Sequence, residues 1–137
     1  MAYEQPGFTF TLVGDATVLN PTNAGASAEG IYYGHQFRFV DCTGAGLCGA
    51  PAANGRQVGV CQNKPRPGSA DSTTIMNSGI SMVMAGGAIT AGADVTTDAT
   101  GAATAAAATN LVAGVALEAA SGSGVIIAVL LRQSRIK

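Results

Sequence analysis

Residues 111–131, LVAGVALEAASGSGVIIAVLL, decide the fold of this chain. The stretch opens with the apolar run 111–117 and closes with a second apolar run, 125–131, and the segment between them is rich in glycine and serine. Short apolar runs separated by such a turn are typical of β-strands. The second run has seven residues, whereas a membrane-spanning helix needs about twenty. It therefore predicts a buried strand and no membrane anchor.

The same pattern continues toward the N-terminus. Residues 74–76 and 80–84 alternate as strands around Asn77-Ser78-Gly79, and residues 85–101 place Gly and Asp at turn spacing. Roughly six to eight short strands at intervals of about 8–12 residues are typical of a small β-barrel or sandwich. The sequence therefore predicts an all-β fold of short glycine-punctuated strands. Residues 102–108 (AATAAAA) favour a strand or extended loop, with a turn of helix as the alternative, because alanine is the best helix former.

The N-terminal residues have a different pattern from the rest, so we expect the chain to consist of two parts. Residues 1–30 predict an extended N-terminal arm followed by a loop, and residues 31–137 predict a single β domain. In the arm, Phe8, Phe10 and Leu12 alternate with threonines, which places three large apolar side chains on one face of a half-buried strand.

Between the arm and residue 72 the pattern predicts further strands at residues 31–33, 36–40 and 58–62. Within the second of these strands, Phe37 and Phe39 would face one way and Arg38 the other. Residues 43–56 contain several glycines and a proline, and they predict a turn-rich loop.

Composition excludes several classes of function. Of the 137 residues, 19 are glycine and only 11% are charged, and the formal net charge is −1. A disordered chain needs high charge, and a nucleic-acid-binding module needs a basic surplus. We therefore expect neither, and the near-zero charge gives no attraction to nucleic acid or to an anionic membrane.

The three cysteines indicate neither a metal site nor a disulfide framework. Cys42, Cys48 and Cys61 lack the spacing of a zinc site, since no CxxC occurs. Residues 1–10 have no basic or apolar region of a secretory signal, which favours a reducing compartment and free thiols. A disulfide between Cys42 and Cys48 is the alternative.

Little catalytic chemistry is visible. His35 is the only histidine, and nothing near it in sequence supplies a nucleophile, so we expect it at the surface or at the core edge before a strand. The aspartates fit turns better than a calcium loop, and no phosphate-binding loop is present. We expect no enzyme activity, no cofactor and no metal. Arg132, Arg135 and Lys137 near the C-terminus are either solvated or a basic patch for an acidic partner.

Five segments occur in a fixed order: residues 37–41 (FRFVD), 58–68 (VGVCQNKPRPG), 79–101 (GISMVMAGGAITAGADVTTDATG), 114–121 (GVALEAAS) and 125–131 (VIIAVLL). In this order they resemble the small capsid decoration, or cement, proteins of tailed double-stranded DNA bacteriophages. The opening MAYEQP with Phe8-Thr-Phe10 also looks like the arm of that family. Residues 20–30 and 47–55 look like extra loop relative to short family members, and we assign them no family role.

The resemblance implies a virion structural protein, made in the host cytoplasm and placed on the outer capsid surface. It implies a homotrimer at three-fold and quasi-three-fold positions that binds the major capsid protein after expansion and cements neighbouring subunits. An N-terminal strand can add to the edge of a neighbouring sheet. The candidate interface residues are therefore Phe8, Phe10, Leu12, Arg132 and Arg135.

Two other classes stay open at this point. A head-fibre or tail-associated protein that binds the host surface would share a glycine-rich β body, with its contacts in the long loops 14–30 and 43–56. An enzyme or carrier domain is a third class. A carrier would need a lysine at a hairpin tip, whereas Lys64 lies in a proline-rich turn.

Overall fold

The computed structural model describes residues 7–15, 35–64 and 72–137. Every regular element in these residues is a β-strand, so the all-β prediction is confirmed. No helix among them is long and apolar enough to cross a membrane. The strand predicted at residues 31–33 lies outside the described residues. The strands are β1 (Thr9–Gly14), β2 (Phe39–Gly44), β3 (Leu47–Gly49), β4 (Gly59–Cys61), β5 (Ser72–Met76), β6 (Gly79–Met84), β7 (Asp94–Thr97), β8 (Ala103–Ala105), β9 (Leu111–Ala116) and β10 (Ile126–Ile136).

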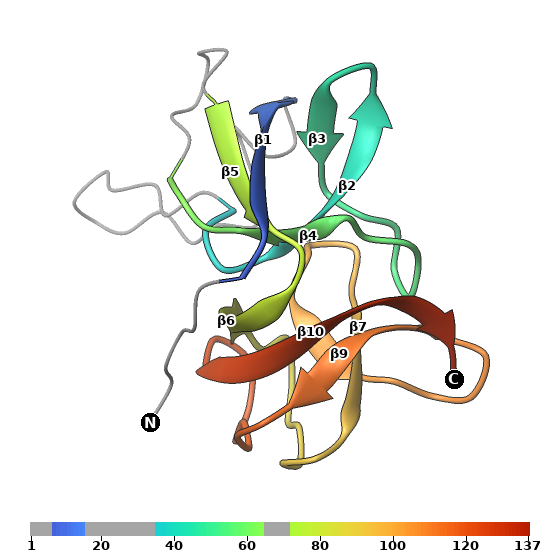
Figure 1. Cartoon of the computed structure of the whole chain (residues 1–137). Helices are drawn as coiled ribbons and strands as arrows, with labels where there is room; N and C mark the ends of the chain where they lie inside the picture. The colour runs from blue at the N-terminus through green and yellow to red at the C-terminus, as the bar shows by residue number, and fades with distance from the viewer. Residues whose placement is uncertain (1–6, 16–34, 65–71) are drawn as a thin grey trace.

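Five of these strands close into a small barrel, the upper half of Figure 1, in the order β1-β3-β2-β4-β5. Neighbouring strands of the barrel are antiparallel except β1 and β3, which run parallel and pair only at Val13–Leu47 and Gly14–Cys48. The closure of the barrel therefore depends on one short parallel contact.

Residues 9–14, which we expected in an extended arm, form a strand of this barrel. β1 pairs with β5 from Thr9 opposite Met76 to Val13 opposite Ser72. The expected half-buried strand is present, but these residues lie within the barrel and not in an extended arm, because Phe10 and Leu12 pack against the buried centre of the barrel. The division of the chain at residue 30 stays a prediction.

The barrel has two sets of side chains, as strand alternation requires. Its interior holds Val40, Cys48, Cys61 and Ile75, with Phe10, Leu12 and Val58 packed against them. The alternate residues Phe39, Val60 and Met76 are paired across β2, β4 and β5, and they belong to a different buried cluster. They therefore point out of the barrel.

The other five strands form a sheet in the order β6-β10-β9-β7-β8, the lower half of Figure 1. Its inner face carries Val83, Val95, Ile127, Val129 and Leu131. An isolated bridge between Ala85, just after β6, and Ala103 in β8 brings the two edges of the sheet together. The sheet therefore wraps around its own core.

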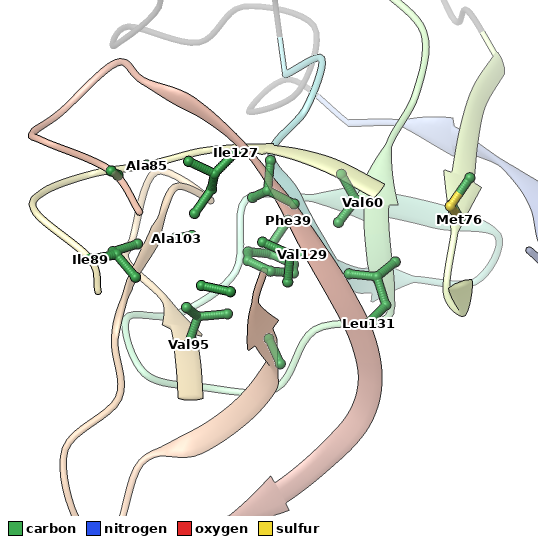
Figure 2. Close-up of a cluster of buried hydrophobic side chains, with 14 residues drawn as sticks. Phe39, Val60, Met76, Ala85, Ile89, Val95, Ala103, Ile127, Val129 and Leu131 are labelled. Carbon is green, nitrogen blue, oxygen red and sulfur yellow. The ribbon is translucent and has the colours of Figure 1, made fainter. Parts of the chain in front are cut away.

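One core joins the two sheets. Phe39, Val60 and Met76 from the barrel pack in the same cluster as Val129 and Leu131 from the second sheet (Figure 2). Burying a large apolar side chain stabilises a fold by about 1.5–3 kcal/mol. The side chains of Phe39, Val60 and Met76, which point out of the barrel, thus join the two sheets through a shared core.

Several predicted strands are confirmed, and their pairing adds detail. β5 and β6 flank Asn77-Ser78 as expected, yet they belong to different sheets, so this short connection is a crossover. Residues 103–105 form the strand β8 against β7, so the helical alternative for the alanine run is wrong. β10 continues past residue 131 to Ile136, because it pairs again with β9 after a register shift between Leu131 and Arg135.

Two expectations near β2 are wrong. Phe37 has φ 62 and lies in a turn, so the strand begins at Phe39 and the two rings do not share a strand face. The N–H of Phe37 donates to the carbonyl of Cys61 at 2.8 Å, and its carbonyl accepts from Met84 N–H at 2.8 Å. Through these two hydrogen bonds the turn bridges β4 and β6. The predicted loop 43–56 also contains β3, which forms a hairpin with β2.

A substitution at Gly101 tests the contact between the two sheets. It has φ +81, and a Cβ at this position would overlap the carbonyl oxygen of Phe39. We expect Gly101→Ala to lower the free energy of unfolding by about 2 kcal/mol or more, since both strain and overlap oppose alanine. Urea unfolding measures this change. Gly87→Ala is the matched control, because its Cβ would meet nothing within 4 Å; equal stability of the two variants would contradict the prediction.

Candidate functional site

The candidate residues at the N-terminus divide between two environments. Phe8, before β1, is 63% exposed, whereas Phe10 and Leu12 are half-buried against the barrel core. The predicted half-buried face therefore holds for Phe10 and Leu12, and of the three side chains Phe8 is the one with a large exposed apolar surface.

Phe8 is nevertheless held in place. Its N–H donates to Ser78 Oγ at 3.0 Å, and its carbonyl accepts from Asn77 N–H at 3.1 Å. Its ring lies against that of Phe10, with the centroids 6.4 Å apart and the planes tilted by 33°. An exposed aromatic ring fixed at both the main chain and the side chain loses little conformational entropy on binding.

Among the strands that the structure describes, none pairs with one edge of β1 in its first half. The N–H of Val13 donates to Gly46 at 2.9 Å, on the β3 side. Peptide groups that face one edge alternate along a strand, so those of Thr9 and Thr11 point toward the same side. Because β3 pairs with β1 only at Val13 and Gly14, no strand among the described residues lies opposite Thr9 and Thr11.

The outer face of β1 carries no charge. Thr9, Thr11 and Val13 are exposed, and Val13 pairs with the exposed Leu47 of β3. We call these four residues together with Phe8 the β1 strip. Sequence reasoning missed Thr9, Thr11, Val13 and Leu47 as contact candidates. The alternation in β1 that predicted a buried face with Phe10 and Leu12 also implies an exposed face with Thr9, Thr11 and Val13.

The candidate arginines lie on β10, in the second sheet. Arg132 is exposed and directly follows Leu131, where the pairing with β9 shifts. The main chain of Arg135 pairs with Val112 after the shift. The structure therefore places the two arginines on a different sheet from the β1 strip, and the five candidates do not form one cluster.

The described residues hold no group of three or more His, Cys, Asp or Glu side chains that could bind a metal ion. Charged side chains in this part of the chain support turns and loops. Arg56 forms a two-pronged ion pair with Asp41, at 3.0 and 3.2 Å, and the carboxylate of Asp98 accepts hydrogen bonds from the main chain of Thr100 and Ala102. These contacts stabilise the connections between strands.

The three cysteines are free. Cys42 is exposed and stands opposite the buried Cys48 in the β2–β3 ladder. Burial raises the pKa of the Cys61 thiol to about 12, and burial also raises the pKa of Cys48. Only the thiolate reacts readily, so the two buried thiols are shielded both sterically and electrostatically.

His35 is buried, with 2% of its surface exposed, in the turn before β2. Its expected place at the surface or core edge is therefore corrected to the interior. The neighbouring Arg38 reaches across to the second sheet, where its guanidinium donates to Thr100 Oγ1 at 2.8 Å. His35 therefore lies where the turn before β2 contacts the loop between β7 and β8 of the second sheet.

The phage cement protein family model matches residues 16–132. The chain belongs to this family, so it is a phage structural protein and a component of the virion that associates with the capsid.

The fold also matches a solved structure. The head fibre gp8.5 N base of bacteriophage phi29 superimposes with a TM-score of 0.67 and 19% sequence identity, over 95% of this chain and 98% of that one. At this identity the similarity shows a shared fold. No curated protein matches the chain.

The two phenylalanines are expected to respond differently to truncation. Phe8→Ala should change the free energy of unfolding by less than about 0.5 kcal/mol, because the ring is exposed. Phe10→Ala should cost about 2 kcal/mol, since a half-buried ring gives part of the 3–5 kcal/mol of a fully buried one. Urea unfolding of each variant measures both values, and equal losses would contradict the assigned environments.

Thiol accessibility gives a second check. In the native protein we expect one thiol of the three to react with a disulfide reagent such as Ellman's, and all three after unfolding, because only Cys42 is exposed. Absorbance during the reaction counts the thiols, and Cys42→Ser should remove the native reaction. A native protein with no reactive thiol and only one after unfolding would show that Cys42 and Cys48 are bonded.

Proposed function

We propose that this protein decorates the outer surface of a phage capsid and cements neighbouring major capsid proteins after the shell has expanded. The family match over residues 16–132 is the observation that carries the proposal. In this role the chain acts as a homotrimer at three-fold and quasi-three-fold positions and is made in the host cytoplasm. It needs no active site, cofactor, nucleic acid or membrane.

The β1 strip is the proposed capsid contact. Its open edge offers the peptide groups of Thr9 and Thr11 to an extended segment of a major capsid protein, and such pairing gives affinity through main-chain hydrogen bonds. Phe8 and Val13 flank this edge with apolar surface. Phe10 and Leu12 take part indirectly, because they hold the strand against the barrel.

Arg132 and Arg135 supply a second contact in this proposal. Both lie in the later half of β10, away from the uncharged β1 strip. Arginines at the rim of an interface guide an acidic partner into register more than they add affinity. Three copies of each contact on a trimer would add up to tight attachment from weak single contacts.

Co-sedimentation with capsids that lack the protein tests the proposal. On expanded shells we expect binding to saturate at about one chain per capsid subunit. On unexpanded shells we expect little binding, because multivalent binding needs symmetry-matched sites. Quantified gel bands of the pelleted shells give the ratio. Equal binding to both shell states would contradict the dependence on expansion.

A proline substitution distinguishes binding through the main-chain edge of β1 from binding through the rest of the surface. Thr11→Pro removes the N–H that faces the open edge, and proline is tolerated at strand edges. We expect it to weaken binding to expanded shells, whereas Thr11→Val, which keeps the N–H, should bind like the unmodified protein. Equal binding of both variants would place the contact elsewhere.

A head-fibre role is the second candidate, and the shared fold with the phi29 head fibre base favours it. In that case the chain would form the attachment base of a projecting fibre or would bind the host surface. The same sedimentation experiment distinguishes the two roles, since a fibre would saturate at a handful of copies per shell.

A further inference from the structure

His35 is a buried titratable group that the capsid contact does not use. It is the only histidine of the chain, and its side chain is 2% exposed. Neither ring nitrogen makes a hydrogen bond of good geometry, although the peptide of Phe39 lies close to the ring. A buried polar ring without partners is costly, and a charged one is far more so.

The ring lies at the joint between the barrel and the second sheet. Here Phe39 N–H donates to the carbonyl of Gly101 at 2.7 Å, and Met84 N–H donates to the carbonyl of Phe37 at 2.8 Å. Gly101 is packed so closely that a Cβ on it would lie 2.9 Å from His35 Nε2. The ring is therefore packed closely against Gly101 at this joint.

The charges around the ring do not compensate a proton on it. Arg38, three residues after His35 in the same turn, is a cation that repels an imidazolium. Asp98 and Asp15 attract it more weakly. Neither carboxylate bonds the ring: Asp98 Oδ1 accepts from Thr100 and Ala102, and Asp15 Oδ2 accepts from Thr43 Oγ1.

We propose that the joint between the barrel and the second sheet is acid-sensitive: a proton on His35 forces the buried ring toward water and opens the joint. The Phe39–Gly101 and Met84–Phe37 hydrogen bonds are the ones that break first, because they link the segment that carries the ring, residues 35–39, to the second sheet. The barrel and the second sheet then separate locally, while each keeps its own strand pairing.

The direction of the pH dependence follows from linkage. Burial, and secondarily the charge of Arg38, lower the pKa of His35 from 6.5 to about 4. Between these two values the unfolded or opened state binds more protons, so stability falls as the pH falls through this range and levels off below it. A difference of 2.5 pKa units, from 6.5 to about 4, corresponds to an about 300-fold decrease in the equilibrium constant for closing the joint.

NMR titration of the single histidine ring tests this directly. We expect no change in its signals above about pH 5 and a titration below it, while hydrogen-exchange protection at the amides of Phe39 and Met84 falls progressively as the pH drops below 6.5. The amide of Gln62, which donates to the carbonyl of Thr74 in β5 at 2.8 Å within the barrel, should stay protected. A ring that titrates near pH 6.5, or one that is protonated without loss of protection at these two amides, would overturn the proposal.

Two variants provide the comparison. His35→Phe keeps an aromatic ring but cannot be protonated, so its unfolding in urea should lose the about 300-fold dependence between pH 6.5 and 4. Thr96→Val is the control, because Thr96 is fully buried and unpartnered but does not titrate, so this variant should keep the dependence. Equal pH dependence of His35→Phe and the unmodified protein would overturn the proposal. If His35→Phe does not fold, the titration alone decides, and neither measurement needs a capsid.

Discussion

The row of Phe39, Val60 and Met76 is the contact on which the rest of the structure depends. These three side chains are paired across β2, β4 and β5, and they point out of the barrel into the core of the second sheet. Because side chains alternate along each strand, a register shift of one residue would exchange this row with the barrel interior. One pairing register therefore determines both cores and the joint between them.

Much of the fold follows from local alternation. β6, β9 and β10 were predictable because period-two patterns and glycine turns act within a few residues. Their partners were not predictable. β5 and β6 are consecutive but belong to different sheets, and β3 lies inside a stretch rich in turn residues. Phe37 was misjudged because a sharp turn, imposed by hydrogen bonds to Cys61 and Met84, overrides its strand propensity.

The candidate site shows the same division between local and distant information. The alternation indicated correctly that Phe10 and Leu12 face the barrel interior, whereas Phe8, which precedes β1, is exposed. The opening beside Thr9 and Thr11 depends on where β3 ends, which no local pattern reveals. The inward residues of β1 thus hold the barrel together, while its outward side chains are exposed.

Alanine fills much of the second sheet's core, at residues 85, 103, 113, 116 and 120. A methyl group has no rotamers to change, and the valines beside it have one strongly preferred χ1. Interiors packed in this way are hard to compress and transmit strain. The wrapped sheet should therefore be mechanically stiff and transmit a load with little deformation.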